Sequence, residues 1–183
     1  MDFLFYLSVL SVLYIVKVDD VYIHGDMPPA GQYWEKLTKE HPRVQWVYHD
    51  KAQRIFDAQV GRIEHVADVI RHDLMLKYGG VHIDTDAVFN KSLDRRYFHY
   101  DTVISMDSDL FPSRPFKDVI NLGVALTRPY SRFWQLYQWN ERYYYEKDYI
   151  WNSNRVPYKI WERNPELIMI EPHLQLICCH LKC

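Results

Sequence analysis

Asp84 and Asp86 stand at the end of a short apolar strand predicted over residues 81–84. Alternate residues of a strand point to the same side, so we expect the two carboxylates to converge on one point. Carboxylates about 4 Å apart repel by a few kcal/mol at an effective dielectric near 20. Either one of them stays protonated or a cation lies between them. Mg²⁺-type sites take one or two carboxylates together with substrate phosphates, so the pattern predicts a metal site for a phosphate-bearing substrate.

A helix predicted over residues 62–77 precedes this strand. On it Asp68 and Arg71 are three residues apart and therefore share a face. One interpretation is an exposed ion pair worth well under about 1 kcal/mol. The other is that both side chains reach a ligand held at the aspartates, because arginine donates to sugar hydroxyls and aspartate accepts from them. The core stripe of this helix is predicted to be Val66, Ile70 and Leu74.

Two glycines, Gly79 and Gly80, join the helix to the strand. We expect the first to end the helix in the left-handed conformation that other residues avoid. We expect the second to allow a close approach of another backbone segment. A glycine pair alone is a weak signal, but its place between an Asp-x-x-Arg helix and an Asp-x-Asp strand makes it much stronger.

The size and composition of the chain suit one domain with a real core, since 48 % of the 183 residues are apolar. A formal charge of −2 without a basic stripe gives no case for nucleic acid. The apolar run at residues 3–16 is too short for a bilayer, which needs about 20 residues. Its acidic flanks are also unlike those of a signal peptide. We interpret it as a buried helix, with a signal or anchor remnant as the alternative.

Strands alternate with helices along the chain, which predicts an α/β layered fold with a largely parallel sheet. Ligands gather at the carboxyl ends of the strands in such sheets, where His24, His49, Asp84 and Asp86 fall. The predicted helices lie at 3–17, 31–40, 62–77, 130–146 and 157–163. The predicted strands lie at 20–24, 43–49, 81–84, 102–106, 120–126 and 167–170.

Several segments together resemble glycosyltransferase family 32, in its sugar-binding region with the DXD motif. The specific part is Ala67-Asp68-x-x-Arg71 followed by Tyr78-Gly79-Gly80-Val81-His82-Ile83-Asp84-Thr85-Asp86. Supporting similarity comes from Ser92-Leu93-Asp94, from Tyr22-Ile23-His24-Gly25 and from Asn121-Leu122-Gly123. The family includes α-1,6-mannosyltransferases, animal α-1,4-galactosyl- and N-acetylglucosaminyltransferases, and large glucosylating bacterial toxins. His82 stands where relatives often have tyrosine.

The resemblance implies a GT-A-like fold, a Rossmann-like mixed and mostly parallel sheet flanked by helices, with residues 1–183 as a single domain. Asp86 would bind Mn²⁺ or Mg²⁺ on the diphosphate of a UDP- or GDP-sugar, and Asp84 would contact the ribose and the sugar, or the metal through water. Asp68 and Arg71 would hold the sugar hydroxyls. The glycine pair and Asn121 would belong to the substrate site.

The same resemblance implies transfer to a glycan or glycolipid acceptor with retention of configuration, in the Golgi lumen. Membrane association would then depend on a segment outside this chain. A first strand before residue 3 and a segment after about residue 175 would also lie outside it. Two alternatives stay open, namely a non-catalytic truncated paralogue and an Asp-x-Asp phosphohydrolase, the latter leaving Asp68, Arg71 and the glycine pair unused.

Three smaller features are explained without a functional role. Asp107 and Asp109 repeat the Asp-x-Asp spacing, but we expect a solvated turn there. The aromatic cluster of Trp139, Trp151 and residues 143–145 could bind an acceptor, but we expect it to cover the sheet. The cysteines at 178, 179 and 183 are odd in number, so at least one is unpaired within the chain.

Overall fold

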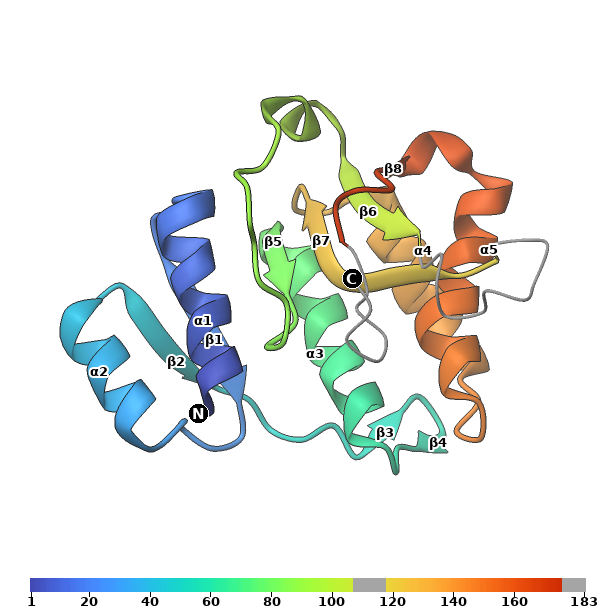
Figure 1. The fold of residues 1–183 in the computed structure, drawn as a ribbon. Coiled ribbons are helices and arrows are strands. Elements are labelled where there is room, and N and C mark those ends of the chain that lie inside the picture. Colours follow the sequence, from blue (N-terminus) through green and yellow to red (C-terminus); the bar gives the residue numbers. More distant parts are fainter. Residues whose placement is uncertain (107–117, 176–183) are drawn as a thin grey trace. The chain divides into compact units, whose positions relative to one another are not determined.

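The structure is a computed structural model, and it describes residues 1–106 and 118–175 (Figure 1). The chain divides into two compact units. Unit 1 consists of residues 1–51 and 84–94, and unit 2 of residues 52–83 and the described residues from 95 onward. Helices and strands alternate as expected, which confirms the α/β class. That the chain forms one catalytic domain stays a prediction.

Unit 1 is built on two parallel strands, β1 (Val21–Gly25) and β2 (Val44–Tyr48). The apolar run forms α1 (Phe3–Ser11) and continues as the π-helical turn η1 (Val12–Val16). It is thus a helix leading into a strand, as predicted. The other helix is α2 (Gln32–Glu40). The core of this unit consists of Tyr6, Val9, Leu37 and Val44 with their apolar neighbours.

Unit 2 contains a four-stranded sheet in the order β5-β7-β6-β8. Its strands are β5 (Gly80–Ile83), β6 (Thr102–Met106), β7 (Ile120–Thr127) and β8 (Met169–Ile170). β7 is antiparallel to both β5 and β6, and only β8 is parallel to its neighbour. The prediction of a mostly parallel sheet is therefore wrong for this sheet. Parallel neighbours usually need a helical crossover, and β5, β6 and β7 follow one another without an α-helix in the described residues.

Three helices accompany this sheet: α3 (Ile63–Tyr78), α4 (Arg132–Asn140) and α5 (Val156–Arg163). α4 ends earlier than predicted and passes into the 3₁₀ turn η3 (Glu141–Tyr143). The core between sheet and helices includes Ile104, Ile120, Phe133, Trp134 and Tyr137. The remaining elements are the hairpin β3 (Arg54–Ile55) and β4 (Ala58–Gln59), the 3₁₀ turns η2 (Arg95–His99) and η5 (Pro165–Leu167), and the π-helical turn η4 (Trp151–Arg155).

The buried face of α3 is polar. Its buried residues are His65, Asp68, His72 and Met75. The predicted core stripe is therefore wrong, because Val66, Ile70 and Leu74 are only partly buried. Polar side chains can be buried where they find hydrogen-bond partners. Other segments of unit 2 supply such partners to α3.

Both glycines of the joint between α3 and β5 have positive φ, but Gly79, with ψ −151°, does not adopt the predicted left-handed helical conformation. Gly79 has φ +64° and donates its N–H to the carbonyl of Met75 at 3.1 Å, which ends the helix. A Cβ at Gly79 would lie 2.6 Å from the backbone nitrogen of Pro129. Gly80 has φ +98° with open space around it. The close backbone approach thus falls on the first glycine, and its assignment to Gly80 is wrong.

None of the helices in residues 1–106 and 118–175 has the length and apolar content needed to cross a bilayer.

Candidate functional site

The Asp-x-Asp segment forms a turn. Asp84 follows the last residue of β5 directly, and its carbonyl accepts the N–H of Ala87 at 3.0 Å. Thr85 and Asp86 are therefore the central residues of a β-turn. The prediction that both aspartates lie on one face of a strand is wrong, since ladder pairing ends at Ile83. The convergence of the two carboxylates stays a prediction.

Two serines of α1 hold this turn within unit 1. The Ser8 hydroxyl lies 3.5 Å from the carbonyl oxygen of Asp84. The Ser11 hydroxyl accepts the N–H of Phe89 at 3.0 Å and donates to the carbonyl of Ser8 at 2.7 Å. Both serines are buried, with 2 % and 6 % of their surface exposed. α1 therefore fixes the backbone that carries both aspartates.

The carboxylates of this turn have the chemistry of a Mg²⁺ or Mn²⁺ site. Asp86 is exposed, and Asp84 is half-buried. No group of three or more His, Cys, Asp or Glu side chains in residues 1–106 and 118–175 is placed to hold a metal ion. Cations of this kind need only one or two protein carboxylates, because phosphates and water complete the shell. The donor set at Asp84 and Asp86 therefore fits such an ion bound together with a diphosphate.

Asp68 and Arg71 form a largely buried ion pair in unit 2. The Asp68 Oδ1 atom lies 2.9 Å from Arg71 Nη1, and the two side chains are 10 % and 11 % exposed. The interpretation of an exposed surface pair is therefore wrong. A buried pair is costly to break, because the remaining charge is left desolvated.

Both members of this pair have further partners. Asp68 Oδ2 accepts the Ser153 hydroxyl at 2.5 Å. Arg71 Nε donates to His82 Nε2 at 2.9 Å. Arginine is always a donor, so the imidazole nitrogen that accepts this bond carries no proton. Each group is thereby held at two points.

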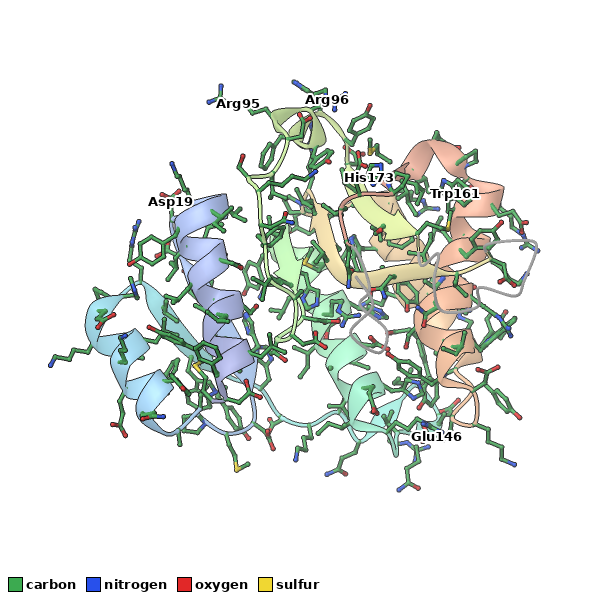
Figure 2. The ribbon with its side chains drawn as sticks, in the orientation of Figure 1. Asp19, Arg95, Arg96, Glu146, Trp161 and His173 are labelled. Carbon is green, nitrogen blue, oxygen red and sulfur yellow. The ribbon has the colours of Figure 1, made fainter. Side chains whose placement is uncertain are left out.

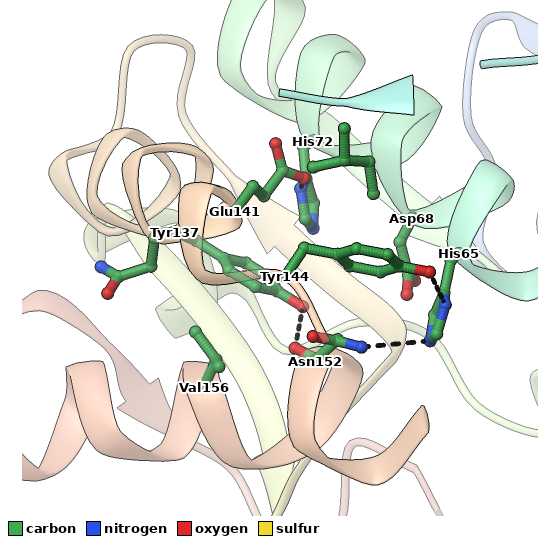
Figure 3. A pocket seen from close by; sticks show the side chains of 10 residues that line it. His65, Asp68, His72, Tyr137, Glu141, Tyr144, Asn152 and Val156 are labelled. Atoms are coloured by element: carbon green, nitrogen blue, oxygen red, sulfur yellow. Dashed lines mark hydrogen bonds and ion pairs between the residues drawn. The ribbon is translucent and has the colours of Figure 1, made fainter. Parts of the chain in front are cut away.

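A second chain of hydrogen bonds starts one turn earlier on α3 (Figure 3). His65 Nδ1 lies 2.5 Å from the Tyr144 hydroxyl, which donates in turn to Glu146. Since the hydroxyl has one proton, His65 must donate to it through Nδ1. His65 Nε2 is then free to accept from Asn152 Nδ2 at 3.5 Å. The chain of donors ends on Glu146, which borders the loop after β4 at Gly61 and is labelled in Figure 2.

This arrangement shifts two ionisation equilibria. Burial, followed by the hydrogen bond to Glu146, raises the pKa of Tyr144 well above its usual value. The same hydrogen bond is the main cause that lowers the pKa of Glu146. Tyr144 therefore stays a neutral donor and Glu146 an ionised acceptor at neutral pH.

A small cavity of about 20 Å³ lies between α3, α4 and the segments after α4. Figure 3 shows His65, Asp68 and His72 on one side of it and Tyr137 and Asn152 on the other. His72 Nδ1 contacts the Glu141 carboxylate, and His72 Nε2 is buried with no hydrogen-bond partner in the described chain. The volume suits a water molecule and is too small for a sugar ring.

Asn121 lies at an irregularity of the sheet. Its Oδ1 accepts the N–H of Gly123 at 2.7 Å. The register of β6 against β7 shifts between Ile104 and Ser105, beside Asn121. Such bulges re-aim side chains and are frequent near active sites. A substrate contact by Asn121 stays a prediction.

The two histidines that the sequence placed at strand ends meet in unit 1. His24 Nδ1 and His49 Nε2 are 2.8 Å apart, because β1 and β2 are parallel neighbours.

The prediction that the aromatic cluster covers the sheet is wrong for its most exposed members. Trp139, Tyr143 and Tyr145 are 59 %, 68 % and 52 % exposed. Asp107, Asp109 and the three cysteines lie outside the described residues.

Comparison with known families bears on the segment that holds most of these residues. Residues 33–108 match the family model of the glycosyltransferase sugar-binding region containing the DXD motif. The resemblance is thereby confirmed. The matched segment includes the Asp68–Arg71 pair, the glycine joint and the Asp84–Asp86 turn, but not Asn121. Searches of curated proteins and of solved structures found no match.

The matched segment therefore contains two groups of side chains. The Asp84–Asp86 turn belongs to unit 1, and the Asp68–Arg71 pair with Gly79 and Gly80 belongs to unit 2. That both groups act on one ligand stays a prediction. The sequence analysis missed Ser8, Ser11, His65 and Ser153. The two serines at i and i+3 inside an apolar helix were the one available signal.

Proposed function

We propose that this chain is the catalytic domain of a metal-dependent glycosyltransferase. It would move a sugar from a UDP- or GDP-sugar to a glycan or glycolipid acceptor with retention of configuration. The observation that carries the proposal is the Asp84–Asp86 turn, fixed by α1 and lying in a segment that matches the DXD sugar-binding region. The compartment that we propose with it is the Golgi lumen.

At this turn, Asp86 would bind Mn²⁺ or Mg²⁺ together with the donor diphosphate, and Asp84 would contact the ribose and the sugar. The exposure of Asp86 supports this role, since a metal ligand must be open to the incoming ion. When bound, the metal ion would neutralise charge that develops on the departing nucleoside diphosphate. The hydrogen bonds between the Ser8 and Ser11 hydroxyls and the backbone of Asp84 and Phe89 would keep the turn in place as the donor enters.

Asp68 and Arg71 would hold hydroxyls of the donor sugar. The two side chains are bonded to each other, and they are also bonded to Ser153 and His82, which holds them in place. Each carboxylate oxygen has two acceptor sites, and the guanidinium has five donors. A buried and pre-ordered pair loses little entropy on binding. Gly79, Gly80 and Asn121 would also belong to the substrate site.

The proposal is tested by calorimetric binding of UDP and of GDP to the full chain, with Mn²⁺ and with a chelator. We expect Mn²⁺-dependent binding of one nucleotide and its loss in Asp86→Asn. Asp20→Asn, an exposed aspartate of the same unit, is the matched control and should bind normally. Donor hydrolysis is then screened with UDP-galactose, UDP-N-acetylglucosamine, UDP-glucose and GDP-mannose.

Two results would count against the proposal. A folded chain that binds neither nucleotide with Mn²⁺ would favour a non-catalytic paralogue. Cleavage of an aryl phosphate that depends on Asp84 would instead indicate a phosphohydrolase.

A further inference from the structure

The helical segment before α5 contains the wide π-helical turn η4. The N–H of Val156 bonds to the carbonyl of Trp151, five residues back. Pro157 has no N–H to give to the Ser153 carbonyl, and a proline ring crowds the carbonyl four residues before it. An α-helical pattern is therefore disfavoured at this point. Single π-helical turns of this kind are frequent at functional sites.

η4 is fixed to the core of unit 2 on two sides. The Tyr137 hydroxyl donates to the carbonyl of Asn152 at 2.9 Å, which ties the turn to α4. Asn154 Nδ2 donates to the carbonyl of Ile120 at 2.9 Å, which ties it to β7. The turn therefore has little freedom to shift along α3.

From this fixed turn, Ser153 reaches the buried ion pair of α3. Its hydroxyl lies 2.5 Å from Asp68 Oδ2, and the two residues are 5 % and 7 % exposed. Asp68 Oδ1 is bound by Arg71, which lies on the same helix. Ser153 supplies the bond from outside the helix, so it decides which way the carboxylate faces. The orientation of Asp68 in turn helps to place the guanidinium of Arg71, which also donates through Nε to His82.

We propose that Ser153 is a positioning residue for the Asp68–Arg71 pair, and that η4 is the element which sets its place. The part that concerns substrate rests on the proposed function, in which this pair holds the donor sugar. Loss of the Ser153 hydroxyl then weakens recognition of the sugar and leaves binding of the nucleoside diphosphate with its metal unchanged.

The test compares Ser153→Ala with Ser131→Ala and Ser153→Thr. Ser131 is a matched control, because it is a buried serine of the same unit whose hydroxyl bonds to Thr102 at 2.7 Å, away from Asp68. Ser153→Thr keeps a hydroxyl at the same position. Thermal unfolding of all three variants shows how much of any effect is a general loss of stability.

The first readout needs no activity. The side-chain Nε–H signal of Arg71, assigned by its loss in Arg71→Lys, is followed by ¹H–¹⁵N NMR. In the wild-type chain and in Ser131→Ala we expect one sharp signal with slow hydrogen exchange. In Ser153→Ala the hydrogen bond from the Ser153 hydroxyl to the Asp68 carboxylate is lost, so the Asp68–Arg71 pair is held less firmly. We therefore expect exchange of the Arg71 Nε–H to be at least about ten-fold faster. An Arg71 signal that is unchanged in Ser153→Ala would overturn the positioning role.

The second readout separates sugar from nucleotide. For the donor found in the hydrolysis screen, we expect Ser153→Ala to raise KM about ten-fold, with Ser153→Thr restoring most of it. Binding of the matching nucleoside diphosphate with Mn²⁺ should change less than about two-fold. Equal KM values for Ser153→Ala and Ser131→Ala would overturn the link to substrate. A wild-type chain without any nucleotide binding would instead refute the proposed function, while the NMR result would still decide the positioning role.

Discussion

Asp68 shows how burial alters the meaning of a charged pair. The sequence places two opposite charges three residues apart on a helix, a spacing common on solvated surfaces. In the structure the carboxylate is buried and bound by Arg71 and Ser153. Spacing alone could not predict this, because the covering partner lies 85 residues further along the chain.

We therefore expect Asp68→Ala to lower the free energy of unfolding by about 3 kcal/mol or more, since it removes the buried carboxylate that contacts the Arg71 guanidinium and leaves the buried Ser153 hydroxyl without its acceptor. Chemical denaturation measures this directly. The double variant with Arg71→Ala should be much less than additive, because the two residues form one network. A loss below about 1 kcal/mol would mean that the pair behaves as a solvated one.

The lowered pKa of Glu146 predicts how the stability of the folded chain changes with pH. Its pKa is lowered in the folded chain, mainly by the Tyr144 hydroxyl, so the folded state favours the ionised form. The stabilisation of the folded chain by ionised Glu146 is present above the ordinary glutamate pKa, and it is lost as the pH falls through the lowered pKa. We expect Glu146→Gln to destabilise the chain at pH 7, with the difference from wild type vanishing under acidic conditions. Urea unfolding at pH 7, 5 and 3.5 checks this, and a difference that grows on acidification would contradict it.

Among the elements, the joint between α3 and β5 separates two roles of glycine. Both residues have positive φ, but only Gly79 approaches another backbone segment closely. We expect Gly80→Ala to cost about 1–2 kcal/mol for the positive φ alone. Gly79→Ala should cost distinctly more, because its Cβ would collide with Pro129 and Thr127. Denaturant midpoints of the two variants give the order, and equal losses would show that the close approach can relax.

The elements themselves were largely predictable, and their junctions were not. The helix at 62–77 and the strands at 102–106 and 120–126 follow from apolar patterning, and the structure places them within a residue or two. The turn at Asp84 could not be read from the pattern, because it depends on where β7 stops pairing with β5. The buried polar face of α3 could not be read either, since it depends on η4 and on the residues after α4.

At the scale of the whole molecule, each unit has its own core. Leu37 is fully buried in unit 1, and Ile104 is fully buried in unit 2. We expect Leu37→Ala to lower the stability of unit 1 by about 2–5 kcal/mol, as core truncations do. Hydrogen exchange followed by mass spectrometry should show faster exchange in residues 1–51 and also in 84–94.

Ile104→Ala is the matched substitution in the other unit. It should accelerate exchange in residues 63–83 and 120–140 more than in residues 1–51. If Leu37→Ala left residues 84–94 as protected as in the wild-type chain, the assignment of that segment to unit 1 would be refuted.

The discontinuity of unit 1 has a consequence for the order of events at the ribosome. Synthesis delivers α1 to β2 first, then 32 residues of unit 2, and only afterwards the segment 84–94. Until Phe89 leaves the exit tunnel, the Ser11 hydroxyl has no N–H from that segment to accept. The N-terminal unit is therefore completed late, and its last piece to arrive is the one that holds both aspartates. A pause in translation shortly after residue 51 would prolong the time during which the Ser11 hydroxyl and its neighbours on α1 lack the 84–94 segment.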